Sequence, residues 1–189
     1  MKELQGGGEK MSKIQVRISY FFNKNSIELR KQIQNCLIKE IGGVENKIKI
    51  KKGKYGKPYI ANEHGIDYNI AHTIGVGVIA FCEHSIGVDV EYVRGIPEEV
   101  LKRCYHSEEQ QYVLEANGKK EMERRFYEVW TKKEAYVKYL GVGINNQFPL
   151  YNVFDKLISD NFHSIYINDY IITVYVEGEC FAIWEKGRI

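Results

Sequence analysis

Alternating apolar and polar residues, the pattern of half-buried β-strands, recur along most of this chain and constrain its fold more than any other feature. Residues 13–22 are the first such segment, and residues 68–81 contain two short buried strands broken by a turn. Three more segments close the sequence, at 163–167, 170–176 and 180–185, with turn residues between them. Segments of this length predict short and mainly antiparallel sheets.

Two helical patterns lie among these strands. Residues 26–41, which we expect Ser26 to cap, place apolar side chains near one stripe and end at Gly42. Residues 122–140 form a longer amphipathic pattern, closed by Gly141. Helices and short sheets in one chain predict an α+β fold, with the helices packed on the sheets.

The chain divides into an extension and two halves. Residues 1–12 are expected to be loosely ordered, residues 13–93 form an N-terminal half, and residues 94–189 form a C-terminal half. In the second half, Ser107 and Gln110 fit the capping box that starts a helix.

Composition excludes several classes of protein. The chain has 189 residues and a formal net charge of +2, so the total charge gives no argument for nucleic-acid binding. The 4 cysteines have no spacing typical of zinc or of a redox motif, which predicts reduced, mostly buried thiols in a cytoplasmic protein. No apolar run is long enough to cross a bilayer, so no membrane contact is expected.

The segment "GVDVE", Gly87 to Glu91, reads as a strand that carries two carboxylates on one face. Val88 and Val90 share the opposite face, because side chains alternate along a strand. Asp89 and Glu91 therefore lie side by side, where their charges repel. Either that face is solvated, or a cation lies against it.

The segment "WTKKEAYVK" places an acid and a base on the inner stripe of the long helix. Trp130, Glu134 and Lys138 share one helical face, and the large aromatic ring indicates that this face is partly buried. A surface pair of Glu134 and Lys138 is the simpler alternative. Together with Asp89 and Glu91, however, Glu134 supplies a third carboxylate that could converge on Mg²⁺, which prefers oxygen ligands.

Two further residues suit a phosphate ligand. Lys57 lies in the turn "YGKPY", and His72 lies in "NIAHT" beside the hydroxyl of Thr73. An exposed turn lysine and a hydrogen-bonded core histidine are the alternatives for Lys57 and His72, since short motifs also match by chance.

In order, "YGKP", "NIAHT", "GVDVE" and "WTKKEAYVK" resemble the motifs of the Sfp-type 4′-phosphopantetheinyl transferases. The last two motifs, at their observed separation, are the specific ones. The resemblance implies a monomer of two similar α+β halves in a pseudo-twofold arrangement, with coenzyme A bound between them. It also implies Mg²⁺-dependent transfer of the phosphopantetheine arm to a serine of an apo acyl or peptidyl carrier protein, releasing 3′,5′-ADP, as in an enzyme of the holo-acyl-carrier-protein synthase type.

The same resemblance assigns roles to individual residues. Asp89, Glu91 and Glu134 are expected to hold Mg²⁺, and Glu134 is also the expected acceptor of the serine proton. Lys138 is expected to neutralise phosphate charge as the second catalytic residue. The coenzyme-binding residues are expected to be Lys57, His72 and Thr73, whereas Lys133, a neighbour on the helix, has a lesser part.

Two positions depart from the family's pattern. Ala71 stands where the family usually has Ser, and Thr73 is the nearest hydroxyl that could compensate. Gln110 stands at the position that we align with a frequent family acid, although Glu109 is adjacent to it.

Two alternative functions remain open at this point. The basic stretch from Lys47 to Lys57, in which Ile48 and Ile50 alternate with lysines, could belong to a non-catalytic module that binds nucleic acid or an acidic partner. The same acids could also serve a Mg²⁺-dependent phosphohydrolase, which would need no carrier protein.

Overall fold

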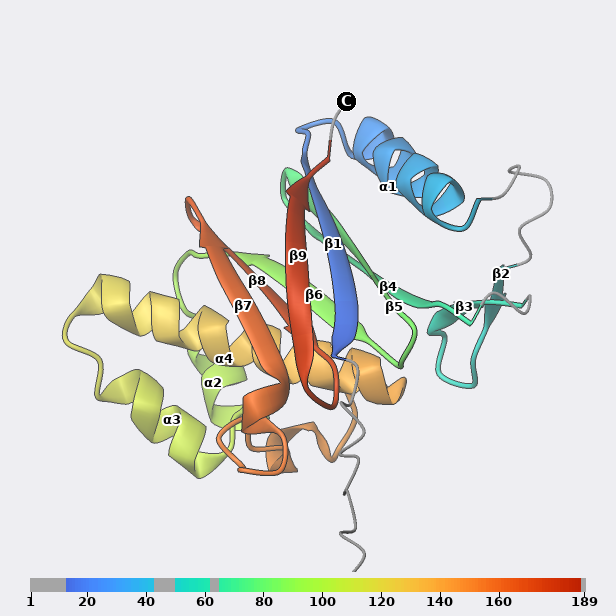
Figure 1. Cartoon of the computed structure of the whole chain (residues 1–189). Helices are drawn as coiled ribbons and strands as arrows, with labels where there is room; N and C mark the ends of the chain where they lie inside the picture. Colours follow the sequence, from blue (N-terminus) through green and yellow to red (C-terminus); the bar gives the residue numbers. More distant parts are fainter. Residues whose placement is uncertain (1–12, 43–49, 62–64, 188–189) are drawn as a thin grey trace, which may run out of the picture.

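The computed structural model describes residues 13–42, 50–61 and 65–187, and the N-terminal extension predicted at 1–12 lies outside these ranges. A four-stranded sheet in the order β4-β5-β1-β9 forms one layer (Figure 1). Its strands are β1 (Ile14–Phe22), β4 (Asp67–Thr73), β5 (Val76–Cys82) and β9 (Cys180–Lys186). All neighbours in this sheet are antiparallel except β1 and β9, which run parallel.

A three-stranded antiparallel sheet in the order β6-β8-β7 forms the second layer. Its strands are β6 (Gly87–Tyr92), β7 (Phe162–Ile167) and β8 (Tyr170–Tyr175). A separate hairpin of β2 (Ile50–Lys52) and β3 (Pro58–Ile60) stands beside the main sheets (Figure 1).

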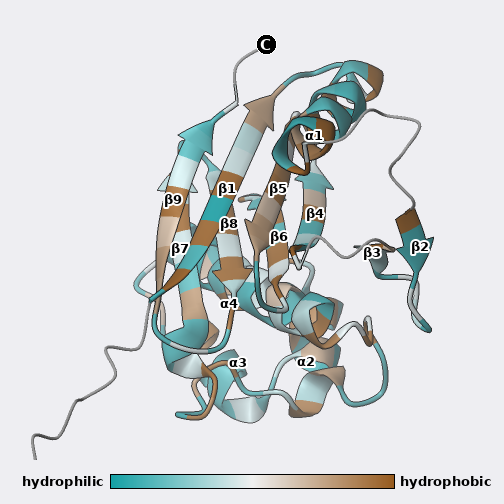
Figure 2. Cartoon of the chain, turned by 45° about the vertical axis from the view of Figure 1, so that its right-hand side comes forward, coloured by the Kyte–Doolittle hydropathy of each residue, from teal (hydrophilic) through white to brown (hydrophobic). Residues whose placement is uncertain are grey.

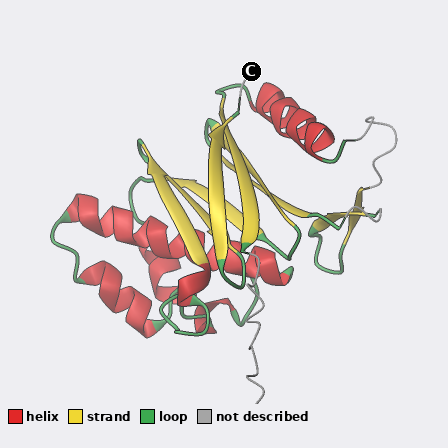
Figure 3. Ribbon diagram, in the orientation of Figure 1, coloured by secondary structure: helices red, strands yellow, loops and turns green. Residues whose placement is uncertain are grey.

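The helices lie on the two outer sides of the paired sheets (Figure 3). Helix α1 (Ser26–Glu40) covers the four-stranded sheet, and α4 (Lys119–Leu140) covers the three-stranded sheet together with two shorter helices. These shorter helices are α2 (Glu98–Cys104) and α3 (Ser107–Leu114), and two single turns follow as η2 (Phe148–Leu150) and η3 (Ser159–Asn161). The molecule is therefore built as helix, sheet, sheet and helices, which is the α+β class that the sequence predicts.

The same order of elements occurs twice along the chain. In the first unit, strand β1 is followed by helix α1 and then by the hairpin β4–β5, and its three strands lie in the order β4-β5-β1. In the second unit, β6 is followed by α4 and then by the hairpin β7–β8, and its strands lie in the order β7-β8-β6. This repetition is what two similar halves require. Strand β9 then returns to the first sheet beside β1, and the division at residue 93 stays a prediction.

Three apolar clusters hold these layers together. The central cluster lies between the sheets and includes Val16, Val78, Val88, Val90 and Val174. A second cluster joins α1 to the outer side of the first sheet, and a third joins α2, α3 and α4 to the outer side of the second. The hydropathy colouring in Figure 2 shows brown, apolar stretches on the strands and a mixed surface on α1.

Two helix starts differ from the sequence prediction. Asn25, not Ser26, caps α1, because its side-chain oxygen accepts hydrogen bonds from the backbone N–H groups of Ile27 and Glu28. Likewise His106 caps α3 one residue before the predicted Ser107, and the Glu109 carboxylate accepts the reciprocal bond from the His106 backbone N–H, a place that the prediction gave to Gln110.

The exposure of Ile50 and of the cysteine side chains tests two other predictions. The alternation of Ile50 with lysines predicts a half-buried strand, but Ile50 is exposed, and its cross-strand partner Ile60 is the residue that packs against the second cluster. Ile48, which belongs to the same alternation, lies outside the described residues. All 4 cysteines are free, but only Cys82 is buried, so the prediction of mostly buried thiols is wrong, while that of reduced thiols stays a prediction. No helix among the described residues has the length and apolar character needed to cross a membrane.

Candidate active site

Strand β6 and helix α4 pack face to face, and Gly87 makes their close approach possible. A Cβ atom at Gly87 would lie 1.9 Å from the backbone oxygen of Ala135 on α4, far inside contact distance. Since side chains alternate along β6, Val88 and Val90 point into the core between the sheets, while Asp89 and Glu91 share the side of Gly87 and α4. The two acids of "GVDVE" therefore face the helix and not bulk solvent.

Asp89 is the buried centre of this contact. Its Oδ1 atom accepts a hydrogen bond from the Lys138 ammonium on α4 at 2.6 Å. Its Oδ2 atom is buried and has no hydrogen-bond partner among the described residues. An unsatisfied buried carboxylate oxygen is unfavourable, so this atom marks the place where the protein lacks a positive or hydrogen-bonding group.

The other two acids lie close enough to Asp89 to change its electrostatics and their own. Burial, followed by the charge of Asp89, raises the pKa of the Glu91 carboxyl, against hydrogen bonds from Thr73 and Trp130. Burial raises the pKa of Glu134 to about 7, and the charge of Asp89 adds to the shift. Each shift means that the ionised carboxylate is poorly stabilised where it stands.

Among the described residues, the Lys138 ammonium bonds to Asp89, and the Arg94 guanidinium acts on Glu91 through its charge. Burial alone would lower the pKa of the Lys138 ammonium, yet the carboxylates around it, Asp89 foremost, raise it above its ordinary value. Three carboxylates against the Lys138 ammonium and the Arg94 guanidinium still leave an excess of negative charge when all are ionised. A divalent cation bound here would remove that excess and satisfy the free oxygen of Asp89, so the residues present fit such an ion.

The acids are neighbours without being gathered around one point. Within residues 13–42, 50–61 and 65–187, no group of three or more His, Cys, Asp and Glu side chains is arranged to hold a metal ion. Rotation of the side chains of Glu91 and Glu134, which are only half-buried, would be needed to bring their oxygens together.

Lys57 reaches the same region from the turn before β3. Its side chain lines a cavity of about 180 Å³, which Lys138 and the end of α4 also line. The lining residues are Tyr55, Lys57, Pro58, Asn69, Ile70, Val137, Lys138, Gly141 and Gly143. The ammonium of Lys57 is not free in this cavity, because it donates hydrogen bonds to Asp67 at 2.8 Å and to the Ile86 carbonyl at 2.9 Å.

His72 and Thr73 leave opposite faces of β4, since they are consecutive on one strand. The Thr73 hydroxyl donates a hydrogen bond to the Glu91 carboxylate at 3.3 Å, which brings Thr73 to the acids. His72 is exposed on the other face. Of the three predicted coenzyme-binding residues, Thr73 therefore contacts one of the acids directly, and Lys57 shares a cavity with Lys138. In the described part of the chain, His72 contacts neither the acids nor this cavity.

A second, wholly buried ion pair lies five residues earlier on α4. Lys133 donates a hydrogen bond to Glu109 at 2.8 Å, and neither side chain is exposed at all. Glu109 also accepts from the backbone N–H groups of His106 and Val153, and Lys133 donates to the Tyr151 carbonyl. This pair joins α3, α4 and the loop after η2.

Sequence reasoning missed the partnership of Glu109 and Lys133 because it compared the family acid with Gln110. Gln110 instead donates a hydrogen bond to the Tyr105 carbonyl at 3.0 Å. The capping box points to Glu109 only when it starts at His106, whereas the prediction started it at Ser107 and so gave the third position to Gln110.

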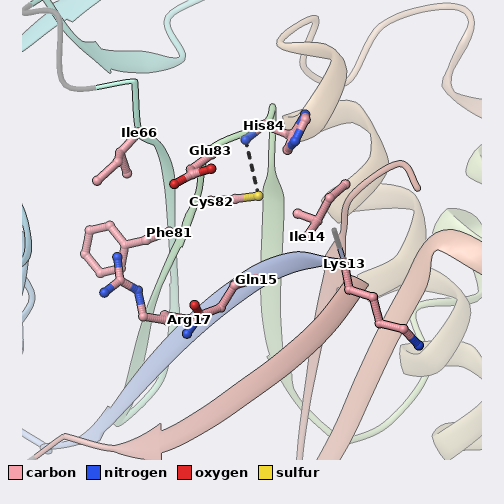
Figure 4. Close-up of a pocket in the computed structure, with 9 residues that line it drawn as sticks. All are labelled: Lys13, Ile14, Gln15, Arg17, Ile66, Phe81, Cys82, Glu83 and His84. Carbon is pink, nitrogen blue, oxygen red and sulfur yellow. Dashed lines mark hydrogen bonds between the residues drawn. The ribbon is translucent and has the colours of Figure 1, made fainter. Parts of the chain in front are cut away.

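Another cavity of about 290 Å³ lies away from these residues, at one end of the four-stranded sheet (Figure 4). Lys13, Arg17, Cys82 and His84 are among its lining residues, and the Cys82 sulfur accepts a hydrogen bond from the His84 backbone N–H. It contains none of the predicted site residues.

Comparisons with known proteins point to one superfamily. Residues 85–177, which include β6 and α4, match the 4′-phosphopantetheinyl transferase superfamily. The chain is 31% identical over 130 residues to 4′-phosphopantetheinyl transferase Sfp of Bacillus subtilis, an alignment that covers 69% of this chain and 57% of that protein. It is 30% identical over 113 residues to 4′-phosphopantetheinyl transferase gsp of Aneurinibacillus migulanus, covering 59% and 46%.

A eukaryotic relative extends this similarity. The chain is 26% identical over 144 residues to the L-aminoadipate-semialdehyde dehydrogenase-phosphopantetheinyl transferase of Candida glabrata, covering 66% of this chain and 56% of that protein. The chain therefore spans about half the length of the curated relatives it matches.

Proposed function

Because this chain belongs to the 4′-phosphopantetheinyl transferase superfamily through residues 85–177, we propose that it transfers the phosphopantetheine arm of coenzyme A to a serine of an apo carrier protein. The acceptor would be an acyl or peptidyl carrier protein, and the second product 3′,5′-ADP. The observation that carries this proposal is the meeting of Asp89, Glu134 and Lys138, with one buried Asp89 oxygen left unsatisfied.

The reaction attacks a phosphorus atom of a diphosphate, which requires positioning and neutralisation of charge more than covalent help. Lys138 is placed to neutralise phosphate charge, because its ammonium stays protonated among the acids. Lys57 and Lys138 line one cavity, so both would contact the anionic part of coenzyme A. His72 would reach the coenzyme only from the exposed face of β4.

Glu134 is the proposed acceptor of the serine proton. Burial raises the pKa of Glu134 to about 7 in the absence of a cation, and a cation bound beside it would lower that pKa again. Asp89, Glu91 and Glu134 would hold Mg²⁺, which supplies electrostatic stabilisation of the diphosphate when bound. Thr73 orients Glu91 by donating to its carboxylate.

Three broader statements belong to the same proposal. We propose that the protein acts as a monomer, because the repeated order of elements already supplies both halves within one chain. We place it in the cytoplasm, where its 4 free cysteines stay reduced. Nucleic acid is not among its proposed partners, because Tyr55 and Tyr59 alone could stack on bases near the basic stretch.

The test is incubation of the purified chain with coenzyme A, Mg²⁺ and a panel of apo carrier proteins, followed by intact-protein mass spectrometry. We expect one carrier to gain a single phosphopantetheine group, and no gain when its acceptor serine is replaced by alanine. Release of phosphate from coenzyme A without any carrier present, and no gain in carrier mass, would contradict the transferase and indicate a phosphohydrolase.

A further inference from the structure

The ammonium of Lys57 is already occupied by an anion from the protein itself. Its Nζ atom lies 2.8 Å from the Asp67 Oδ2 atom, and both side chains are only about one-fifth exposed, at 18% and 22%. Nζ also donates to the Ile86 carbonyl at 2.9 Å. A lysine with two strong acceptors has one N–H left for a ligand.

Asp67 is fixed in this position by a second bond. The same Oδ2 atom accepts a hydrogen bond from the Ile86 backbone N–H at 3.0 Å. One step along the same face of β4, the Asn69 side chain accepts from the Val88 backbone N–H at 2.9 Å. Asp67 is therefore part of a row of side chains that attaches β4 to β6, and it cannot move away from Lys57 without breaking that attachment.

From this geometry we infer that Asp67 competes with the phosphate groups of coenzyme A for Lys57 and thereby weakens coenzyme binding. The inference rests on the proposed function, in which Lys57 contacts the coenzyme, and it adds a residue that sets the affinity of that contact. Asp67 is a positioning residue, because it acts through Lys57 and does not line the cavity itself.

Two physical effects act in the same direction. An incoming phosphate can accept from the one free N–H of Lys57, but a second bond to that ammonium must replace the charge-assisted bond to Asp67, so part of the interaction is lost in the exchange. In addition, the Asp67 carboxylate places a negative charge next to the binding site of a ligand that is itself strongly negative. Removal of the charge at position 67 should therefore strengthen binding.

The substitution Asp67→Asn isolates this effect. An asparagine oxygen can still accept the hydrogen bond from the Ile86 N–H, so the attachment of β4 to β6 is kept while the charge is removed. We expect the Kd for coenzyme A, measured by calorimetry with Mg²⁺ present, to fall roughly two- to fivefold, the upper part of the range for a partly exposed ion pair. In turnover, KM for coenzyme A should fall by more than kcat changes.

The same substitution in a Lys57→Met background tests whether Asp67 acts through the lysine. There we expect Asp67→Asn to change Kd by less than about twofold, since only the long-range charge effect remains. A matched control is Glu128→Gln, which removes a carboxylate paired with Lys132 at 2.9 Å and similarly exposed, and which does not line the cavity. Its Kd should equal that of the unchanged protein.

Three results would overturn the inference. Weaker or unchanged coenzyme binding in Asp67→Asn would show that Asp67 does not compete, and an equal gain in the Lys57→Met background would show that it does not act through Lys57. An equal gain in coenzyme affinity in Glu128→Gln would show that the effect comes from the net charge of the protein and not from the position of Asp67. The transferase itself is judged separately by the gain in carrier mass, so either conclusion can fail without the other.

Discussion

Two lysines five residues apart on α4 form ion pairs of opposite character. Lys133 meets Glu109 in a pair with no exposure, in which Glu109 accepts three hydrogen bonds and Lys133 donates two. Lys138 meets Asp89 in a pair that is partly exposed on the lysine side, with one Asp89 oxygen left without a partner. Both pairs join α4 to another element of the fold.

The difference separates a pair with a structural role from one that we propose to be reactive. A buried ion pair is tolerated when hydrogen bonds satisfy all of its atoms, as at Lys133 and Glu109. The pair at Lys138 is surrounded by further acids, Glu91 and Glu134, whose pKa values are raised by burial and by Asp89. Perturbed and unsatisfied groups of this kind cluster at functional sites.

The largest expected effect on activity comes from substitution of Asp89 in its pair with Lys138. We expect Asp89→Ala to lower kcat for carrier modification on the order of 10³-fold, because it removes a proposed ligand of the divalent cation that would stabilise charge at the reacting phosphate. The fold should persist, since the apolar core between the sheets is formed by Val88 and Val90 on the other face of β6. Far-UV circular dichroism checks the fold, and turnover like that of the unchanged protein at limiting Mg²⁺ would contradict the assignment.

Substitution in the fully hydrogen-bonded pair of Lys133 and Glu109 should lower the stability of the fold. Glu109→Gln leaves the Lys133 ammonium buried without a counter-charge, which should lower the free energy of unfolding by about 3–5 kcal/mol in urea denaturation. The double variant Lys133→Met with Glu109→Gln should recover part of that loss, because no charge remains buried and the glutamine oxygen can still accept from a backbone N–H group. A Glu109→Gln protein that is fully stable but inactive would place Glu109 in the active site, and would contradict the structural role that we give to its pair with Lys133.

Lys57 is expected to affect binding more than chemistry. Lys57→Ala should raise KM for coenzyme A about tenfold and lower kcat by less, because a contact remote from the reacting phosphorus stabilises ground state and transition state alike. Steady-state kinetics with varied coenzyme A measure both constants. An unchanged KM would remove Lys57 from the site.

Thr73 should give the smallest effect. Thr73→Val removes one weak hydrogen bond of 3.3 Å to Glu91 and keeps the shape of the side chain. We expect kcat/KM to fall about two- to fivefold, as for the loss of a single partly exposed hydrogen bond. A loss as large as that of Asp89→Ala would mean that Thr73 contacts the reacting groups itself.

The sequence predicted the arrangement at β6 correctly because the alternation of a strand is a local rule. Val88 and Val90 point into the core and Asp89 and Glu91 point to α4, as their order requires. The helical stripe of Glu134 and Lys138 follows from an equally local period. Local rules therefore carried most of the candidate site.

What the sequence could not predict depends on contacts between distant segments. The ion pair of Lys57 and Asp67 depends on where the turn before β3 packs against β4. The parallel pairing of β1 with β9 likewise joins strands that are far apart in the sequence. Glu109 was overlooked because a shift of one residue in the start of α3 changes which side chain points inward.

The most direct test of the account is binding of Mn²⁺, as a spectroscopic substitute for Mg²⁺, measured by electron paramagnetic resonance in the presence of coenzyme A. The account predicts one bound ion per chain in the unchanged protein and in the control Glu128→Gln, and loss of that ion in Asp89→Asn. Mn²⁺ binding of equal affinity in Asp89→Asn would contradict the claim that the acids of β6 and α4 hold a divalent cation.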